Sequence, residues 1–326
     1  MPTRRRALLI LAALAAMALA SVLLALAAGS MAVTPGDILG ALVGDGDGLA
    51  IEVVRGLRLP RALAAFACGG LLALAGALMQ VLLRNPLADP YVLGISGGAA
   101  VGALSAMLAG LALAWINLFA FAGAFAVMLL VFGLAHGDSS WTRARLLLTG
   151  VIVASGCSAV VALVLSIAPE ARLRGMLFWL MGDLAQSGAA WPPLAVLAVA
   201  LTLAMPFARE LNLLARGLLQ AQSLGVAVDR LRHAVYLLAS LATAAAVTTA
   251  GSIGFIGLVV PHLVRLAIGN DQRLLLPASA LAGGALLMLA DTLARSLIAP
   301  QQLPVGVLTA LIGVPIFLFL LSRHAK

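Results

Sequence analysis

Two short stretches of this sequence hold most of the residues that are unusual in a membrane interior. The first, GSIGFIGLVVPHLVR, runs from Gly251 to Arg265 and sets helix-interrupting residues, a histidine and an arginine in an apolar background. Backbone that is not helical is tolerated at membrane depth only where protein or a water-filled cavity satisfies its hydrogen bonds. We therefore expect this stretch to border a cavity or another protein segment. Its candidate residues are Gly251, Gly254, Gly257, Pro261 and His262.

The second stretch, RNPLADPYVLGISGGAA, runs from Arg84 to Ala100 and repeats this combination of small, polar and helix-breaking residues. Two interpretations account for it. The small residues let helices pack closely, or the irregular backbone lines a pathway through the membrane. The sequence favours neither interpretation over the other. The candidate residues here are Asn85, Pro86, Asp89, Pro90, Gly94, Ser96 and Gly97.

The chain shows no energy source of its own. A P-loop needs a lysine after its glycines to reach the phosphates of ATP, and the only lysine, Lys326, follows no such loop. An ion-coupled transporter places Asp, Glu or His at mid-membrane depth, where only Asp291 and His262 qualify. Neither has an obvious partner at helical spacing, and an isolated histidine of this kind is more often a packing residue than a proton relay. We expect no ATP site, no covalent catalysis, no cofactor and no metal site.

The composition limits the fold class. Hydrophobic residues make up 63% of the 326 residues, charged residues only 10%, and the mean hydropathy is +1.13. A soluble domain of this length does not hide so much apolar surface, so we expect an all-α, polytopic membrane protein with a single transmembrane domain over 1–326. The net charge of +8 follows from the preference of Arg and Lys for cytoplasmic loops, and nucleic-acid binding is not expected.

Apolar segments of about 20 residues, the length that crosses the hydrocarbon core, recur along the whole chain. With the N-terminus in the cytoplasm and alternating sides, 14 of the 20 Lys and Arg residues fall on the cytoplasmic side, which favours both termini inside. The first segment is interpreted as a retained helix and not a cleaved signal peptide, because its apolar run exceeds about 15 residues. About ten spans are expected, near 7–28, 62–82, 92–108, 115–135, 145–167, 191–207, 233–250, 256–268, 275–298 and 304–322.

Three connecting segments are long enough to hold functional residues. Outside the membrane, 34–54 carries several acids, and 168–190 is expected to form a short surface helix around RGMLFWLMGD. In the cytoplasm, about 208–232 is expected to form two short helical pieces divided by Gly217 and Gly225. This loop is the only sizeable cytoplasmic feature that we expect.

Arginines gather near the external ends of two expected spans. RGLRLPR places Arg58 and Arg61 just before the second span, and Arg295 lies near the external end of the ninth. Anchoring at lipid headgroups explains such residues, and so does docking of an acidic partner by complementary charge. Both interpretations stay open at this point.

Six motifs resemble, in matching order from about Arg58 onward, the FecCD-type permeases, the membrane subunits of type II ABC importers for ferric siderophores, haem and vitamin B12. The resemblance implies a vitamin B12 importer permease-like fold of ten helices with both termini cytoplasmic. It also implies a homodimer in the bacterial inner membrane, with the pathway on its two-fold axis. The motifs are RLPRALA (58–64), RNPLADPYVLGISGGAA (84–100), GSIGFIGLVVPHLVR (251–265), LPASALAGG (276–284), LADTLAR (289–295) and LPVGVLTALIGVP (303–315).

The resemblance further implies partners besides the lipid bilayer: two ABC ATPase subunits in the cytoplasm and a periplasmic substrate-binding protein. The three external arginines, Arg58, Arg61 and Arg295, match the positions that hold the binding protein. The 208–232 loop matches the ATPase-coupling loop, although the family commonly has LGEEAA where this chain has RGLLQA at 216–221. The implied coupling residues are Leu211, Asn212, Arg216, Gly217, Ala221, Ser223, Leu224 and Gly225.

The function implied by the resemblance is that of an ABC importer permease that moves a metal chelate from periplasm to cytoplasm. A ferric siderophore ranks before cobalamin, and cobalamin before haem. The alternatives are an ion-coupled secondary transporter that works without an ATPase and a membrane-embedded enzyme.

Overall fold

The computed structural model describes residues 4–29, 31–44, 48–135, 143–185 and 187–324, and within these ranges the chain is helical and contains no strand. Among the described residues, seven helical stretches are long and apolar enough to cross a membrane, and three shorter helices are apolar. Each of the ten expected spans overlaps one of these helices, so the expected all-α membrane fold is confirmed. The helices that the expected spans overlap are α1 (Arg4–Ala27), α4 (Leu59–Leu82), α5 (Ile95–Leu108), α6 (Leu113–Ala135), α7 (Arg143–Ile167), α9 (Trp191–Ala204), α12 (Val228–Ala250), α13 (Ile256–Ile268), α14 (Gln272–Ser296) and α15 (Val305–His324).

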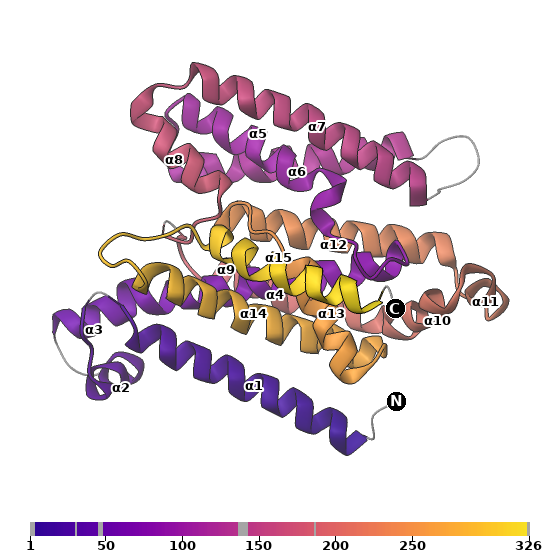
Figure 1. The fold of residues 1–326 in the computed structure, drawn as a ribbon, viewed down its shortest axis with the longest axis horizontal. Coiled ribbons are helices and arrows are strands. Elements are labelled where there is room, and N and C mark those ends of the chain that lie inside the picture. Colours follow the sequence, from indigo (N-terminus) through magenta and orange to yellow (C-terminus); the bar gives the residue numbers. More distant parts are fainter. Residues whose placement is uncertain (1–3, 30, 45–47, 136–142, 186, 325–326) are drawn as a thin grey trace.

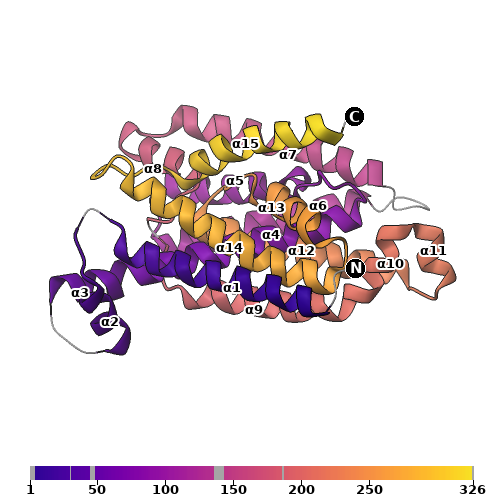
Figure 2. The same ribbon diagram turned by 60° about the horizontal axis from the view of Figure 1, so that its bottom comes forward.

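The short helices mark the two ends of the molecule. We call the end with α2 (Pro35–Val43), α3 (Leu49–Val53) and α8 (Glu170–Leu180) the α8 end. The opposite end, with α10 (Ala208–Arg216) and α11 (Leu218–Ser223), is the α10 end (Figure 2). Helix α1 begins and α15 ends at the α10 end (Figure 1). The expected helix in 168–190 and the two helical pieces in 208–232 are confirmed.

The 34–54 segment, which was expected as an acidic loop, contains the helices α2 and α3. Helix α2 begins with a capping box, in which the Thr34 hydroxyl accepts a hydrogen bond from the Asp37 amide and the Asp37 carboxylate accepts one from the Thr34 amide. These two bonds satisfy amide groups that a helix N-terminus otherwise leaves unpaired. The TPGD sequence at 34–37 carries this signal, which sequence analysis of the loop missed.

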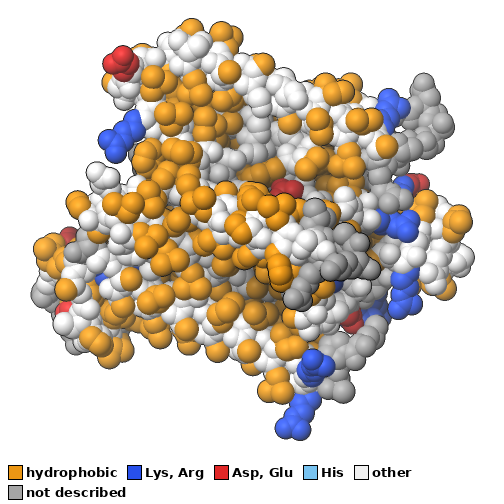
Figure 3. Space-filling model, in the orientation of Figure 1, with side chains coloured by type: hydrophobic (Ala, Val, Ile, Leu, Met, Phe, Trp, Pro, Cys, Tyr) orange, Lys and Arg blue, Asp and Glu red, His pale blue; other side chains and the backbone are white. Residues whose placement is uncertain are grey.

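The helices form two layers joined by α12. Helices α5, α6 and α7 lie together in one layer, while α1, α4, α13 and α14 lie in the other (Figure 1). Hydrophobic side chains cover most of the face in this view, and charged side chains gather mainly toward the two ends (Figure 3). This distribution fits a membrane protein whose helix axes run between the α8 end and the α10 end.

Helix α4 is the centre of the packing, because it contacts α12, α13 and α14 along most of its length. Glycines make these contacts possible. A Cβ atom added at Gly76 would lie 1.8 Å from the Gly257 carbonyl oxygen, and one added at Gly69 would lie 2.2 Å from the Gly283 carbonyl oxygen. Backbones therefore approach each other directly, as small residues permit in membrane helices.

We predict that Gly76→Ala lowers the stability of the purified protein by about 1–3 kcal/mol, because the added methyl group has no space against Gly257. Gly133→Ala in α6 is the matched control, since no heavy atom lies within 4 Å of a Cβ there. Helix propensity makes that control neutral or stabilising by up to about 1 kcal/mol. Thermal unfolding in detergent measures both, and equal midpoints for the two variants would contradict the close contact.

Candidate functional site

The two glycine-rich stretches meet in space. The Ile253 amide donates a hydrogen bond to the Tyr91 hydroxyl at 3.0 Å, and the hydroxyls of Ser96 and Ser252 lie 2.8 Å apart. Tyr91 belongs to the short 3-10 helix η2 (Pro90–Leu93), and Ser96 lies in the first turn of α5. We call this junction between residues 91–96 and residues 251–255 the seam.

Residues 251–255 interrupt the chain between α12 and α13. Gly251 and Phe255 both have left-handed backbone conformations, with φ of 68° and 69°. A Cβ on Gly251 would lie 2.2 Å from the Trp179 carbonyl oxygen, and the Ser252 amide donates to that same oxygen at 3.4 Å. Gly251 therefore permits both the turn and the close approach of the last turn of α8.

The first motif turns through local hydrogen bonds. The Asn85 side chain accepts a hydrogen bond from the Leu87 amide at 2.9 Å, next to the exposed Pro86. The Asp89 carboxylate accepts one from the Tyr91 amide at 2.8 Å and caps η2, in which Pro90 is the first residue. Burial raises the pKa of Asp89 to about 6, and this effect outweighs the lowering of its pKa by the hydrogen bond from Tyr91.

A cavity of about 350 Å³ lies at the seam, between α5 and α7. The hydroxyl-bearing residues Tyr91, Ser96, Ser158 and Ser252 line the cavity together with apolar residues, and no described residue that lines it carries a charge. Such a surface offers hydrogen bonds without strong attraction. The candidate residues that line it are Gly94, Ser96 and Gly97.

The structure shows close packing at some candidate glycines and a cavity beside others, while lining of a transport pathway stays a prediction. Gly94 ends η2 with φ of 77°, and a Cβ on Gly97 would lie 2.9 Å from the Cys157 Cβ in α7. These two residues therefore serve close packing as well as lining the cavity. Gly257 packs against α4, whereas a Cβ on Gly254 would meet no atom within 4 Å.

Helix α13 is fixed to α4 by a polar bridge. Gln80, which is 3% exposed, donates to the Leu258 carbonyl at 3.1 Å and accepts a hydrogen bond from Arg265 at 2.8 Å. Pro261 lies inside α13 and has no N–H, so one helical hydrogen bond is missing in the turn that Gln80 contacts. His262 is buried in this helix with 6% exposure. Gln80 stands as a lone polar residue in an apolar run, a signal that sequence analysis overlooked.

Arg58, Arg61 and Arg295, which were expected on the external side, come together at the α8 end, and each is bonded within the protein. Arg58, which is 5% exposed, donates to the Leu26 and Ala27 carbonyls at 2.7 and 3.0 Å and also to the Met31 carbonyl. Arg295 donates to the Ala25 carbonyl. Carbonyls of the last helical turn have no helical partner, so these two arginines cap the C-terminus of α1.

Asp291 holds the remaining arginine of this cluster. Its carboxylate accepts hydrogen bonds from Arg61 at 2.8 and 2.9 Å, and Arg295 Nε lies 4.0 Å from it one helical turn later. The expectation that Asp291 has no partner at helical spacing is therefore wrong. A buried carboxylate with two guanidinium partners is a structural ion pair, which weakens the proton-relay alternative.

The arginines line a shared surface cavity of about 610 Å³. Its other polar residues include Ser187 and Gln302, and the Gln302 side chain accepts a hydrogen bond from Arg61 at 2.7 Å. Because the three guanidinium groups bond to protein atoms, lipid headgroups are not what holds them in place. Docking of a partner at this cavity stays a prediction.

At the α10 end, α10 packs on α4 and α14 and buries Leu211, while α11 lies at the far end of the molecule (Figure 1). Gly217 and Gly225 have φ of 148° and 81°, and a Cβ at either would meet no atom within 4 Å. The two glycines therefore serve backbone turns and not packing. Ala221 is buried, whereas Arg216, Ser223 and Leu224 are exposed.

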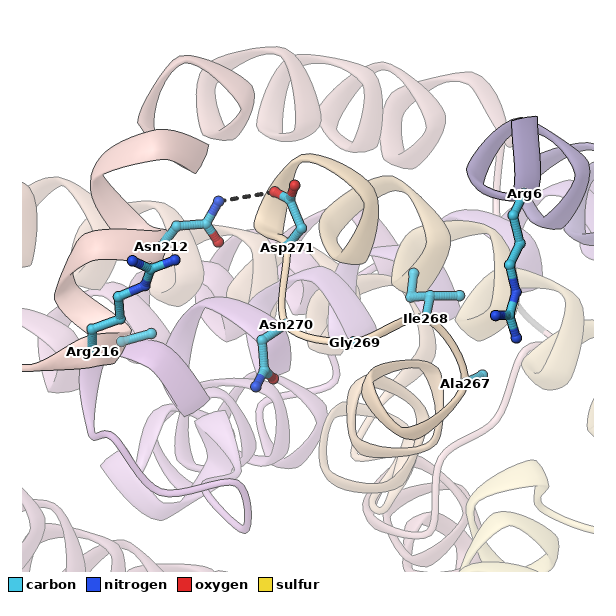
Figure 4. A pocket seen from close by; sticks show the side chains of 9 residues that line it. Arg6, Asn212, Arg216, Ala267, Ile268, Gly269, Asn270 and Asp271 are labelled. Carbon is cyan, nitrogen blue, oxygen red and sulfur yellow. Dashed lines mark hydrogen bonds between the residues drawn. The ribbon is translucent and has the colours of Figure 1, made fainter. Parts of the chain in front are cut away.

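Asn212 has the most specific contacts among the residues expected in the coupling loop. Its side chain bonds to the first residues of α14 and lies beside a cavity of about 580 Å³ (Figure 4). Arg6, from the start of α1, and Arg216 also line this cavity. The sequence marks Asn212 only by its place in the loop, because its partners lie about 60 residues further along the chain.

The family model of the FecCD transport family matches residues 16–323. The chain belongs to the FecCD transport family. It is 45% identical over 286 residues to the hemin transport system permease protein HmuU of Yersinia pestis, covering 83% of each chain. It is 39% identical over 331 residues to the vitamin B12 import system permease protein BtuC of Salmonella paratyphi A, covering 99% of this chain and 98% of that one.

A solved structure agrees with this assignment. An inward-facing metal-chelate type ABC transporter matches this FecCD protein with a TM-score of 0.84 and 31% identity, over 97% of this chain and 99% of that chain. The expected family and fold are confirmed, and the role as a permease of an ABC transporter is supported. In this FecCD permease, the seam joins two of the motifs on which the resemblance was first based.

We predict that Tyr91→Phe lowers stability by about 1–3 kcal/mol, because the Ile253 amide loses its acceptor inside the protein. Tyr236→Phe is the matched control. Tyr236 donates at 2.9 Å to the Met128 carbonyl, which lies within α6 and keeps its helical partner. Thermal unfolding in detergent should show the larger loss for Tyr91→Phe, and an equal or smaller loss than in the control would contradict the role of Tyr91.

Proposed function

We propose that this chain is the permease of an ABC importer that carries a metal chelate from the periplasm to the cytoplasm across a bacterial inner membrane. The observation that carries the proposal is the similarity, over most or all of the chain, to permeases named for hemin and vitamin B12 import. The chain itself performs no covalent chemistry in this proposal. A separate ATPase biases a two-state equilibrium of the pathway by binding and hydrolysing ATP.

The uncharged cavity at the seam supports a cargo that is held weakly. Hydroxyls and small residues give a chelate hydrogen bonds but no strong ion pair, so the cargo can leave the pathway. Selection then rests mainly with the binding protein. Within this class a ferric siderophore remains our first candidate, before cobalamin and haem.

Uptake into proteoliposomes tests the proposal. We expect uptake of one of the three chelates only when ATP, the cognate ATPase and the binding protein are all present. Omission of each component in turn is the control. Uptake by this chain alone on a proton gradient would overturn the proposal in favour of the ion-coupled alternative.

We propose further that two copies form the pathway. Helices α7 and α15 lie on the same side of the molecule (Figure 2), and both expose large apolar side chains. Leu148, Ile152 and Leu163 of α7 are 64%, 70% and 61% exposed, and Leu311 of α15 is 66% exposed. Apolar exposure alone also fits lipid contact, so the dimer needs its own test.

Single cysteines placed along 146–164, in a background with Cys157→Ala, should cross-link between subunits at helical periodicity of about 3.6 residues. Cysteines along the exposed face of α6, at positions such as Leu118 and Phe125, are the matched control and should not cross-link. Equal cross-linking on both helices would indicate random collision in the membrane. An active complex with one permease copy would exclude the dimer.

Docking of the periplasmic binding protein is proposed at the cavity that Arg58, Arg61 and Arg295 line. Three arginines and one aspartate give this cavity a net positive charge, which complements an acidic partner. Arg58 is the less suitable target for a test, because it donates to three carbonyls at and just beyond the end of α1, whereas Arg295 donates to one. Removal of Arg61 and Arg295 must be combined with Asp291→Asn so that no buried carboxylate loses its partners.

The triple variant Arg61→Gln/Asp291→Asn/Arg295→Gln should associate more slowly with the binding protein. The difference should be larger at low salt than at physiological salt, where charges are screened beyond about 8 Å. Asp291→Asn alone keeps both arginines and is the control. Unchanged association rates of the triple variant at both salt concentrations, measured by surface-immobilised binding, would assign these arginines to structure alone.

A further inference from the structure

Asn212 forms a two-sided contact with the start of α14. Its side-chain NH₂ group donates to the Asp271 carboxylate at 2.9 Å (Figure 4). Its side-chain oxygen accepts a hydrogen bond from the Gln272 amide at 2.8 Å. Asp271 is the N-cap of α14 and also accepts a hydrogen bond from the Arg273 amide at 3.1 Å. Both polar atoms of the amide are therefore used. We call this set of three residues, Asn212, Asp271 and Gln272, the clamp.

The clamp fastens the coupling loop to one layer of the molecule. Helix α10 packs on α4 and α14. The clamp adds a contact with the junction between α13 and α14, which we call the corner. That corner belongs to the same body as α4, because the Gln80 bridge and the contact of Gly76 with Gly257 hold α13 against α4. A movement of α10 is thereby passed to α4, α13 and α14 together.

The other end of α13 is the seam. With 13 residues, the helix spans about 20 Å at 1.5 Å per residue. It leads from the clamp at the α10 end to residues 251–255, whose hydrogen bonds to Tyr91 and Ser96 cross to the layer that contains α5. Displacement of one layer against the other would strain these bonds.

We propose that Asn212 is the positioning residue that links the coupling loop to the α13–α14 corner, and through α13 to the cavity at the seam. This inference rests on the proposed function, since it assumes a cytoplasmic ATPase that moves α10 and α11. Because both polar atoms of the Asn212 amide are bonded, α10 cannot shift along α14 without moving the α13–α14 corner as well.

A charge swap tests the clamp. Asn212→Asp places a second carboxylate opposite Asp271 and removes the donor, whereas Asn212→Asp/Asp271→Asn reverses the two side chains and restores a donor and acceptor pair. In the reconstituted complex, uptake per ATP hydrolysed should fall about tenfold in Asn212→Asp, a typical size for a coupling free energy. The swap should recover most of the lost uptake per ATP, as expected if the side chains at positions 212 and 271 pair directly. Asn270→Ala is the control, because the Asn270 side chain points away from the clamp (Figure 4).

A second measurement separates coupling from structural damage. A cysteine at Val161, which lines the seam cavity, reports labelling by a thiol reagent in a Cys157→Ala background. ATP should change the labelling rate in the otherwise unaltered complex and in the swap, but not in Asn212→Asp. Loss of the ATPase from purified Asn212→Asp complexes would instead assign Asn212 to docking and overturn the proposal.

The outcomes distinguish this inference from the proposed function. If ATP changes neither labelling nor uptake in the unaltered complex, the proposed function fails. If the unaltered complex responds and Asn212→Asp responds equally, only the clamp is refuted. A defect in Asn212→Asp that the swap does not relieve would also overturn the direct pairing of Asn212 with Asp271.

Discussion

Backbone groups of residues 251–255 lie between two helices of a membrane protein, where water is not available to satisfy every N–H and C=O. Other parts of the protein supply these partners. Tyr91 accepts from the Ile253 amide, and the last turn of α8 accepts from the Ser252 amide. The interruption can therefore exist only while η2, α5 and α8 stay in place around it. A break in a helix that depends on several neighbours in this way is a natural point of conformational control.

The same rule explains the arginines at the α8 end. The last turn of α1 exposes carbonyl groups that have no helical partner, and Arg58 and Arg295 supply them with charged donors. Asp291 balances this positive charge and holds Arg61 toward the cavity. A residue pattern that resembles a docking surface thus also stabilises the helix end beneath it. The two roles are compatible, because one guanidinium group has five N–H donors.

Glycine has two distinct uses in this fold. At Gly76 and Gly69 its missing side chain lets α4 approach α13 and α14 backbone to backbone. At Gly217 and Gly225 nothing crowds the position, and the left-handed backbone conformation is what requires glycine. The first use brings the central helices into direct backbone contact, and the second gives the 208–232 loop its turns. Composition does not distinguish them, since both occur in stretches rich in small residues.

The sequence by itself determined the class of protein, the approximate spans, the helical pieces of 208–232 and the family. Each of these depends on hydropathy, local turn residues or motif order, which are properties of neighbouring residues. It gave no account of the pairs that build the site. Arg61 and Asp291 are 230 residues apart, and Ser96 and Ser252 are 156 residues apart. Even Asp291 and Arg295, at ordinary helical spacing, were recognised as partners only once the structure was known.

Tertiary structure decided which candidates face a cavity, which face a neighbouring helix and which cap a helix end. Helical periodicity fixes the face on which a residue lies, but not the rotation of that helix against the others. That rotation is set by close packing at contacts such as Gly76 with Gly257, where a single methyl group has no space. Asn212 and Asp271, or Tyr91 and Ile253, come within hydrogen-bonding distance only after this rotation is set.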